Sequence, residues 1–257
     1  MDFTGKTALV TGAAGAIGKG IAAALAAGGA RVFITDLRPE AVEATRKELG
    51  RGTLGLAADV TQEEQAKAAV AAAASAFGGQ VDILANVAGV VGQGRVEKLA
   101  VEEWDAVFAA NCRGTFLFCK HVVPLMKARR RGKIVNFSSK SGKTGSALMS
   151  HYSAAKAAII GFTQALAYEL ADWHINVNCL CPGIVLDTGV WGHVSAGYVK
   201  NLGLPRDEVI KRFTAKVPLG RLAAVSDVVA VTLFLASEVA DYMTGQAINV
   251  TGGREMH

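Results

Sequence analysis

The chain has 257 residues, of which 51% are hydrophobic and 19% charged, and its formal net charge is +5 at pH 7. A chain of this length can bury roughly three quarters of its unfolded surface, and it holds no apolar run of the roughly 18 residues that span a bilayer. Its first residues lack the basic region and long apolar stretch of a secretory signal, so we expect a cytoplasmic protein with no membrane partner.

Short strand-like runs alternate with longer helical patterns along the chain. The predicted strands are residues 6–11, 31–36, 53–58, 81–86, 133–138, 175–181 and 247–250. The predicted helices are residues 16–28, 39–50, 62–77, 102–130, 152–173 and 226–237. Strands such as Ala8-Leu9-Val10 are apolar throughout, which indicates burial on both faces. We therefore predict an α/β fold, with a doubly wound sheet of seven parallel strands and helices on both faces, in a single domain over residues 1–257.

The turn after the first strand, Thr11–Gly18, is rich in small residues and opens the first helix. Small residues let the backbone approach a pyrophosphate, whose charge a helix N-terminus stabilises. Asp36 ends the second strand, where a carboxylate can accept hydrogen bonds from an adenosine ribose and would repel a 2′-phosphate. Asp36 is also a candidate helix cap before Pro39, and nearby Arg38 leaves room for NADP. The pattern favours NAD.

One polar segment follows the fourth strand, and a further polar residue follows a helical run later in the chain. Asn86-Val87-Ala88-Gly89 ends the fourth strand, and Asn111 follows the helical run Trp104–Ala110. The dense basic run over residues 127–133 lies at the end of a predicted helix. Cations there complement the helix dipole, so we interpret the run as a helix end and expect no nucleic-acid partner.

Tyr152 and Lys156 are four residues apart and share one face of a predicted helix. A free phenol has a pKa of about 10, so a base near pH 7 requires about 4 kcal/mol of stabilisation. A lysine cation about 5 Å away supplies about 3 kcal/mol at an effective dielectric near 20, and an oxidised nicotinamide ring supplies more. Ser139 ends the fifth strand, where α/β sheets expose ligand-binding residues. Together these residues predict proton and hydride chemistry.

Residues 186–216 interrupt the alternation with scattered glycines and Pro205. Such a long excursion in a compact domain is usually functional, and we expect a lid over the substrate. The four cysteines are too few for a disulfide scaffold and lack partners at metal-ligand spacing, so we expect reduced thiols and no metal.

These motifs together resemble the short-chain dehydrogenase/reductase family over essentially the whole chain. The family's cofactor turn, Thr-Gly-x-x-x-Gly-x-Gly, matches Thr11, Gly12 and Gly18. The resemblance implies a Rossmann-type fold and a homotetramer, with the helix over 152–173 and the C-terminal strand at interfaces. It also implies that NAD is bound by Gly12, Gly15, Ile17, Gly18, Asp36, Asp59, Val60, Asn86, Ala88, Gly89, Tyr152, Lys156, Pro182, Gly183 and Val185.

The same resemblance assigns catalytic roles to Asn111, Ser139, Tyr152 and Lys156. It implies that a Tyr152 phenolate accepts the proton of the substrate hydroxyl while hydride passes to the nicotinamide. Ser139 would hold the reacting oxygen. Lys156 would lower the pKa of Tyr152 and bind the nicotinamide ribose, and Asn111 would hold a water that links Lys156 to solvent.

Three positions depart from the family pattern. Ala16 stands where the middle glycine usually sits, so an added methyl group lies near the expected pyrophosphate. Val87 replaces the second asparagine of Asn-Asn-Ala-Gly. The threonine usually found five residues after the proline is Asp187, with Thr188 one place later, which leaves the contact to the nicotinamide amide open.

A closer resemblance, carried by residues 139–146 and 244–253, is to polyol dehydrogenases such as the sorbitol-6-phosphate 2-dehydrogenases. Trp191 is expected either to pack the lid or to stack on a sugar. Candidates for hydroxyl contacts are Ser141, Lys143, His151, His193 and Asn201, and candidates for a sugar phosphate are Lys140, Lys143 and Arg206.

Three functional hypotheses remain open from the sequence. The first is a dehydrogenase that interconverts a small-molecule polyol, free or phosphorylated, and a ketose. The second is a 3-oxoacyl or similar carbonyl reductase, which predicts an apolar cleft and NADPH. The third, a nucleotide-sensing module, predicts loss of the Tyr–Lys pair, which this chain retains.

Overall fold

The computed structural model describes the backbone of all 257 residues and the side chains of all except residues 200–202. Its centre is one sheet of parallel strands in the order β3-β2-β1-β4-β5-β6-β7. The strands are β1 (Thr7–Thr11), β2 (Arg31–Asp36), β3 (Leu54–Ala57), β4 (Ile83–Asn86), β5 (Gly132–Phe137), β6 (Ile175–Pro182) and β7 (Ala247–Val250). Strands β2 and β3 are added on one side of β1, and strands β4 to β7 on the other, so the strand order reverses between β1 and β4. In open α/β sheets, ligands bind at such a switch point, beside the carboxyl ends of the strands.

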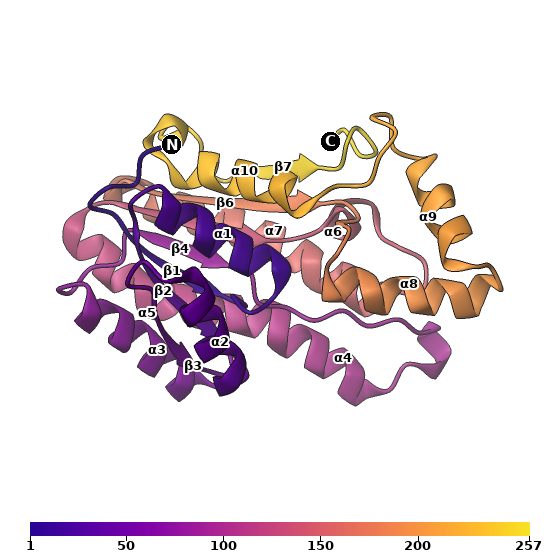
Figure 1. The fold of residues 1–257 in the computed structure, drawn as a ribbon, viewed down its shortest axis with the longest axis horizontal. Coiled ribbons are helices and arrows are strands. Elements are labelled where there is room, and N and C mark those ends of the chain that lie inside the picture. The colour runs from indigo at the N-terminus through magenta and orange to yellow at the C-terminus, as the bar shows by residue number, and fades with distance from the viewer.

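Helices cover both faces of this sheet (Figure 1). They are α1 (Ala16–Ala27), α2 (Pro39–Leu49), α3 (Glu63–Ala76), α4 (Val101–Phe108), α5 (Gly114–Arg129), α7 (Ser150–Leu170) and α10 (Val225–Ala236). Side chains alternate along a strand, so Ala8 and Val10 of β1 join one core with α1 and α10. Leu9 points the other way and joins a second core with α3 and α5. Two buried faces explain why the strands are apolar throughout, and the predicted doubly wound parallel sheet is confirmed.

The helix predicted over 102–130 is divided into two. Residues Ala109–Arg113 form a wide π-helical turn between α4 and α5. Asn111 lies in that turn, and its Nδ2 donates to the carbonyl oxygens of Val107 (2.9 Å) and Val90 (2.8 Å). Apolar residues continue across the turn, so the sequence pattern gives no sign of it. Such turns occur often at functional sites, because they redirect a side chain out of the regular helical ladder.

Residues 186–216, predicted as an irregular excursion, contain two helices. They are α8 (Gly189–Leu202) and α9 (Arg206–Thr214). The Thr188 side chain caps α8 by accepting from the Trp191 amide at 3.1 Å, and Gly203 ends it in the left-handed region with φ 64°. Both helices lie at one end of the molecule, beyond the arrowhead of β7 (Figure 1).

Several short elements were not predicted. They are α6 (Lys140–Thr144), η1 (Val96–Lys98) and η4 (Glu238–Ala240). The helix predicted over 152–173 ends as the 3-10 turn η3 (Ala171–Trp173), directly after α7. Ser139 caps α6 with its side chain, which explains why that helix begins directly after β5. Over the residues described, no helix combines the length and apolar character that crossing a membrane requires.

Candidate active site

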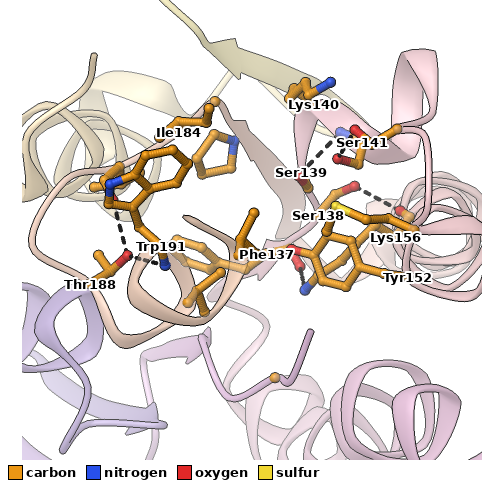
Figure 2. A pocket seen from close by; sticks show the side chains of 18 of the residues that line it. Phe137, Ser138, Ser139, Lys140, Ser141, Tyr152, Lys156, Ile184, Thr188 and Trp191 are labelled. Atoms are coloured by element: carbon orange, nitrogen blue, oxygen red, sulfur yellow. Dashed lines mark hydrogen bonds between the residues drawn. The ribbon is translucent and has the colours of Figure 1, made fainter. Parts of the chain in front are cut away.

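A cavity of about 530 Å³ opens at the carboxyl ends of β4, β5 and β6, and α8 and α9 form part of its wall. The structure brings to this cavity the four residues expected to be catalytic, together with part of the expected cofactor and substrate sets. Figure 2 labels three of the four, Ser139, Tyr152 and Lys156. The expected residues that line the cavity are Ile17, Gly89, Asn111, Ser139, Lys140, Ser141, Tyr152, Lys156, Pro182, Gly183, Val185 and Trp191. Residues from distant parts of the chain therefore share one site.

Tyr152 and Lys156 lie one turn apart on α7, and both line the cavity near Phe137 at the end of β5 (Figure 2). The Lys156 Nζ donates to the Phe137 carbonyl oxygen at 2.8 Å and lies 5.6 Å from the centroid of the Tyr152 ring. The Ser139 hydroxyl accepts from the Ser141 amide at 3.1 Å, which fixes its position beside the ring. The Ser138 hydroxyl faces the other way and donates to the Lys156 carbonyl oxygen at 2.7 Å.

Burial controls the titration of both residues on α7. It raises the pKa of the Tyr152 phenol to about 12, and a hydrogen bond with Ser139 works in the opposite direction. Burial also lowers the pKa of the Lys156 ammonium to about 8. The spacing of Tyr152 and Lys156 predicts that the ammonium lowers the pKa of the phenol towards 7. In the protein alone the cost of burying a phenolate is larger, so that expectation requires a second positive charge beside the ring.

Asn111 and Lys156 meet at a glycine. The Asn111 Oδ1 lies 2.5 Å, and the Lys156 Nζ 3.4 Å, from the point that a Cβ atom on Gly89 would occupy. Glycine at position 89 is therefore required for this approach. Among the described residues, the buried Asn111 Oδ1 has no hydrogen-bond partner. A buried acceptor of this kind calls for a water or ligand donor.

The turn between β1 and α1 is closed tightly at two glycines. Gly12 adopts a φ of 64°, and a Cβ there would lie 2.7 Å from the Ala88 Cα. A Cβ on Gly18 would collide with the Gly12 carbonyl oxygen. At Gly15 the nearest atom would be that same oxygen at 3.4 Å, an ordinary contact. The protein itself thus requires glycine at 12 and 18 but not at 15, and the partly exposed Ala16 fits the turn.

The first turn of α1 has the form of an anion site. No described side chain caps the helix, so its first amides remain available to a ligand. Asp36, at the end of β2, accepts from the Ala14 amide at 3.0 Å and from the Leu37 amide at 2.9 Å. These bonds hold a carboxylate beside the turn, as a ribose-binding acid requires. The residues present therefore fit a dinucleotide.

The remaining expected cofactor residues lie at neighbouring strand ends. The Thr11 hydroxyl accepts from the amides of Val87 (3.0 Å) and Ala88 (3.1 Å), so this turn is held through its backbone. Val87 packs into the core and lines the cavity, and the missing second asparagine leaves the turn intact. Asn86 is buried and donates to Asn136 Oδ1 at 2.9 Å.

Asp59 and Val60, which also belong to the expected cofactor set, follow β3. The Asp59 Oδ1 accepts from the Thr61 amide and hydroxyl, and Val60 packs against the core beneath α5. Neither residue lines the cavity.

The departure from the family pattern after β6 affects the backbone conformation of one residue. Asp187 adopts the left-handed conformation with φ 57°, which aspartate tolerates better than most residues. Thr188 consequently lines the cavity and Asp187 does not. The inserted position therefore moves the threonine hydroxyl along by one place without removing it from the site.

The structure divides the expected substrate residues into two groups. Lys140, Ser141 and Trp191 line the cavity. Trp191 is 3% exposed and packs edge-on against Phe213, with 6.0 Å between ring centroids. Lys143, His151 and His193 do not line it. The same holds for Arg206, and the side chain of Asn201 lies outside the described residues.

Lys143, His151 and His193 each have a different position outside the cavity. Lys143 turns away and donates to the Ala247 carbonyl oxygen at 2.8 Å. His151 is fully buried, with its Nε2 3.5 Å from Glu103 Oε1. His193 is exposed on the outer side of α8. These residues were expected because they are polar and were read as part of loops. In the structure they lie on helices that direct their side chains away from the cavity.

Sequence reasoning missed several residues that line the outer part of the cavity. They are Met149, Tyr198, Arg212, Phe213, Lys216 and Arg254. None belongs to a motif, and the segment that carries four of them was not predicted to be helical. A helical pattern over 206–214 was the one available signal.

Comparison with known proteins agrees with this geometry. A short chain dehydrogenase family model matches residues 6–198. A sorbitol dehydrogenase from Cereibacter sphaeroides is 38% identical, and a galactitol 2-dehydrogenase from Agrobacterium fabrum is 39% identical; each match covers 100% of both chains. The structure is also similar to that of an actinorhodin polyketide ketoreductase variant with NADPH, with a TM-score of 0.94, 38% identity and 98% of each chain covered.

The matched region spans β1 to α8 and so includes all four residues expected to be catalytic. Identity of this level over the full length makes a shared fold and a shared reaction type secure. The chain belongs to the short-chain dehydrogenase/reductase family, whose members are oxidoreductases that act on CH–OH groups with a nicotinamide cofactor.

Proposed function

We propose that the protein is an NAD-dependent polyol dehydrogenase that interconverts a sugar alcohol, a hexitol such as sorbitol or its 6-phosphate, and a ketose. The observation that carries this proposal is the convergence of Ser139, Tyr152 and Lys156 on a cavity that continues past further hydroxyls. The Ser141 and Ser146 hydroxyls lie 2.8 Å apart in its wall, so either can exchange hydrogen bonds with substrate hydroxyls. The two full-length polyol dehydrogenase relatives support the same substrate class.

In this proposal Tyr152 moves the proton. As a phenolate, it accepts the proton of the substrate hydroxyl, and in the reverse direction it returns that proton to the carbonyl oxygen. Ser139 donates to the same oxygen, which stabilises the charge that builds there. The nicotinamide, when bound, accepts or supplies the hydride. The side chain of Trp191 and the α8–α9 segment act as the lid that excludes water.

Lys156 and Asn111 set the electrostatics in this proposal. Lys156 carries a positive charge at neutral pH because its pKa of about 8 is still above 7, and that charge favours the phenolate. It also binds the ribose next to the nicotinamide. The unpartnered Asn111 Oδ1 beside Lys156 holds a water, through which the ammonium exchanges its proton with solvent.

We propose NAD as the cofactor because of Asp36. Two amides fix its carboxylate at the end of β2, where it accepts from ribose hydroxyls and repels a 2′-phosphate. The rest of the proposed cofactor site follows the strand ends. It comprises Gly12, Gly15, Ile17 and Gly18, then Asp59, Val60, Asn86, Ala88 and Gly89, then Pro182, Gly183 and Val185.

We also propose that the protein is a homotetramer. Tyr168 on α7 is 88% exposed, and Phe116 on the neighbouring α5 is 45% exposed. Phe116 packs edge-on against Phe162 of α7, so the two helices present aromatic surface side by side. Such a surface is typical of a subunit interface. Light scattering of the purified protein tests the assembly, and a monomer would contradict it.

The experiment that tests the function is a substrate panel. Sorbitol, galactitol and xylitol, with the available phosphates, are oxidised with NAD⁺, and an acetoacetyl thioester is reduced with NADH and NADPH. Turnover of a polyol with NAD⁺ is expected. Inertness of every polyol would refute the substrate class.

A 3-oxoacyl reductase is the second candidate, and apolar side chains in the cavity favour it. Phe137, Met149, Val190 and Val194 line the wall, and the similar ketoreductase structure was solved with NADPH. Faster reduction of the thioester with NADPH than oxidation of any polyol would select this candidate.

A further inference from the structure

The outer part of the cavity is strongly positive. Lys140, Lys156, Arg212, Lys216 and Arg254 line the cavity, and none of the described residues that line it is Asp or Glu. Lys156 is used at the reaction centre. The other four, which we call the basic rim, have no part in the proposed proton or hydride transfer.

Members of the basic rim come from three segments and are close enough to interact. Lys140 follows Ser139 at the end of β5 and lies beside it in Figure 2. The Lys216 Nζ lies 5.8 Å, and the Arg254 Cζ 5.6 Å, from the centroid of the Phe213 ring. Burial lowers the pKa of Lys140, and charge repulsion from Arg254 and Lys216 lowers it further, while Glu255 acts in the opposite direction. The three cations therefore act on one region of space.

One carboxylate lies against this cluster and does not balance it. Glu255 Oε1 is 3.3 Å from Arg254 Nε and 3.9 Å from Lys140 Nζ, and the glutamate side chain is only 7% exposed. The ion pairs of the described residues include neither Arg212 nor Lys216. Four cations therefore face one carboxylate, which leaves a formal excess of three positive charges at the rim. A cleft lined by charge of one sign attracts a ligand of the opposite sign.

We propose that the basic rim binds the phosphate monoester of a phosphorylated polyol, so that the preferred substrate is a hexitol phosphate and not the free hexitol. The inference rests on the proposed function and specifies its substrate. Ser139, Tyr152 and the basic rim all line the same cavity. One substrate can therefore place its reacting hydroxyl at Tyr152 and its phosphate at the rim. Arginine and lysine form charge-assisted hydrogen bonds with phosphate, which are stronger than neutral ones.

This assignment differs from the set that the sequence indicated. Lys143 is engaged by the Ala247 carbonyl oxygen, and Arg206 is exposed at the start of α9 without lining the cavity. Of the three residues that the sequence indicated for a sugar phosphate, Lys140 alone lines the cavity. Arg206 therefore serves as a matched control, because its removal takes a positive charge from the same helix as Arg212 but not from the cavity.

The test is the ratio of kcat/KM for sorbitol 6-phosphate to kcat/KM for sorbitol, both measured with NAD⁺. We expect a ratio well above about ten in the native enzyme, because each charge-assisted contact contributes about tenfold. Lys216→Gln and Arg254→Gln should each lower the ratio by about tenfold, and Arg206→Gln should leave it unchanged. Glu255→Gln should raise it, because the competing carboxylate is lost; a purely structural role for Glu255 would not produce a rise. A ratio near one that no variant alters would overturn the proposal.

Calorimetric titration of the enzyme–NADH complex with inorganic phosphate separates this inference from the function it rests on. Weaker binding in Lys216→Gln and stronger binding in Glu255→Gln would support the basic rim even if no polyol were oxidised. Oxidation of free polyols without phosphate binding would overturn the rim and retain the dehydrogenase. Equal phosphate affinity in all variants would likewise contradict the rim.

Discussion

The two ends of the candidate site are built in different ways. The nucleotide end is made within one short stretch, from β1 through α1 to β2, and depends on backbone: a closed turn at Gly12 and Gly18 and free amides at the start of α1. The outer end is made of side chains, with Lys140, Phe213 and Arg254 arriving from separate segments. A site made of backbone restricts the residue type at each of its positions. A site made of side chains from distant segments places no such restriction on the residues between those segments.

Tyr152→Phe removes the group at which the two ends meet, and we expect the largest effect. The turnover number should fall by about a thousandfold or more, because a general acid–base group contributes up to about four orders of magnitude. Affinity for NADH, measured by fluorescence titration, should stay near the native value. Tyr168→Phe, on the exposed side of the same helix, is the control and should retain activity. Full activity in Tyr152→Phe would remove the mechanism.

Gly18→Ala tests the nucleotide end. The new Cβ meets the Gly12 carbonyl oxygen, so the turn must open, and we expect NADH affinity to fall by about a hundredfold with a lower melting temperature. Gly15→Ala is the matched variant, because its Cβ would lie 3.4 Å from that oxygen and the fold should be unaffected. Equal losses of melting temperature in both variants would show that the turn is not selected by internal contacts.

Asp36→Asn tests the choice of cofactor. Loss of the charge removes repulsion of a 2′-phosphate, so the ratio of kcat/KM for NADP⁺ to that for NAD⁺ should rise by about tenfold or more. Arg38→Ala, the neighbouring change, should move the ratio the other way by a smaller factor. If the native enzyme already used NADP⁺ as efficiently as NAD⁺, the role proposed for Asp36 would be contradicted.

Lys156→Met has a smaller, pH-dependent effect on stability. The pKa of Lys156 is about 8 in the folded protein and 10.5 in its ordinary state. Between these values the unfolded chain holds a proton that the folded protein has released, so the free energy of unfolding rises with pH. We expect denaturant titrations to show a gain of about 1 kcal/mol per pH unit between pH 8 and 10 in the native protein relative to Lys156→Met. Parallel profiles would place the Lys156 pKa at its ordinary value.

The sequence predicted the parallel sheet well because burial on both faces leaves apolar runs at every strand. It also located Tyr152, Lys156 and Ser139, which depend on short spacings and strand ends. The π-helical turn at Asn111 could not be predicted, because the apolar pattern of the helix continues through it. Three members of the basic rim, Arg212, Lys216 and Arg254, were missed because the α9 segment and the C-terminal residues meet β5 only in three dimensions.

Helix direction explains the expected substrate residues that were misplaced. His151 and Tyr152 are neighbours in the sequence, but one turns into the protein beside Glu103 and the other into the cavity. His193 lies two residues after Trp191 and is exposed, whereas Trp191 is buried. When a segment is read as a loop, the direction of its side chains cannot be predicted. It is then not possible to say which of its polar side chains enters the cavity.

The most direct test of the account is the pKa of the Tyr152 phenol with and without NAD⁺, measured by ultraviolet difference titration against Tyr152→Phe. Burial sets the value near 12 in the protein alone. With NAD⁺ bound, a second positive charge beside the ring should lower it by about two units or more. An unchanged value on binding NAD⁺ would contradict Tyr152 as the base.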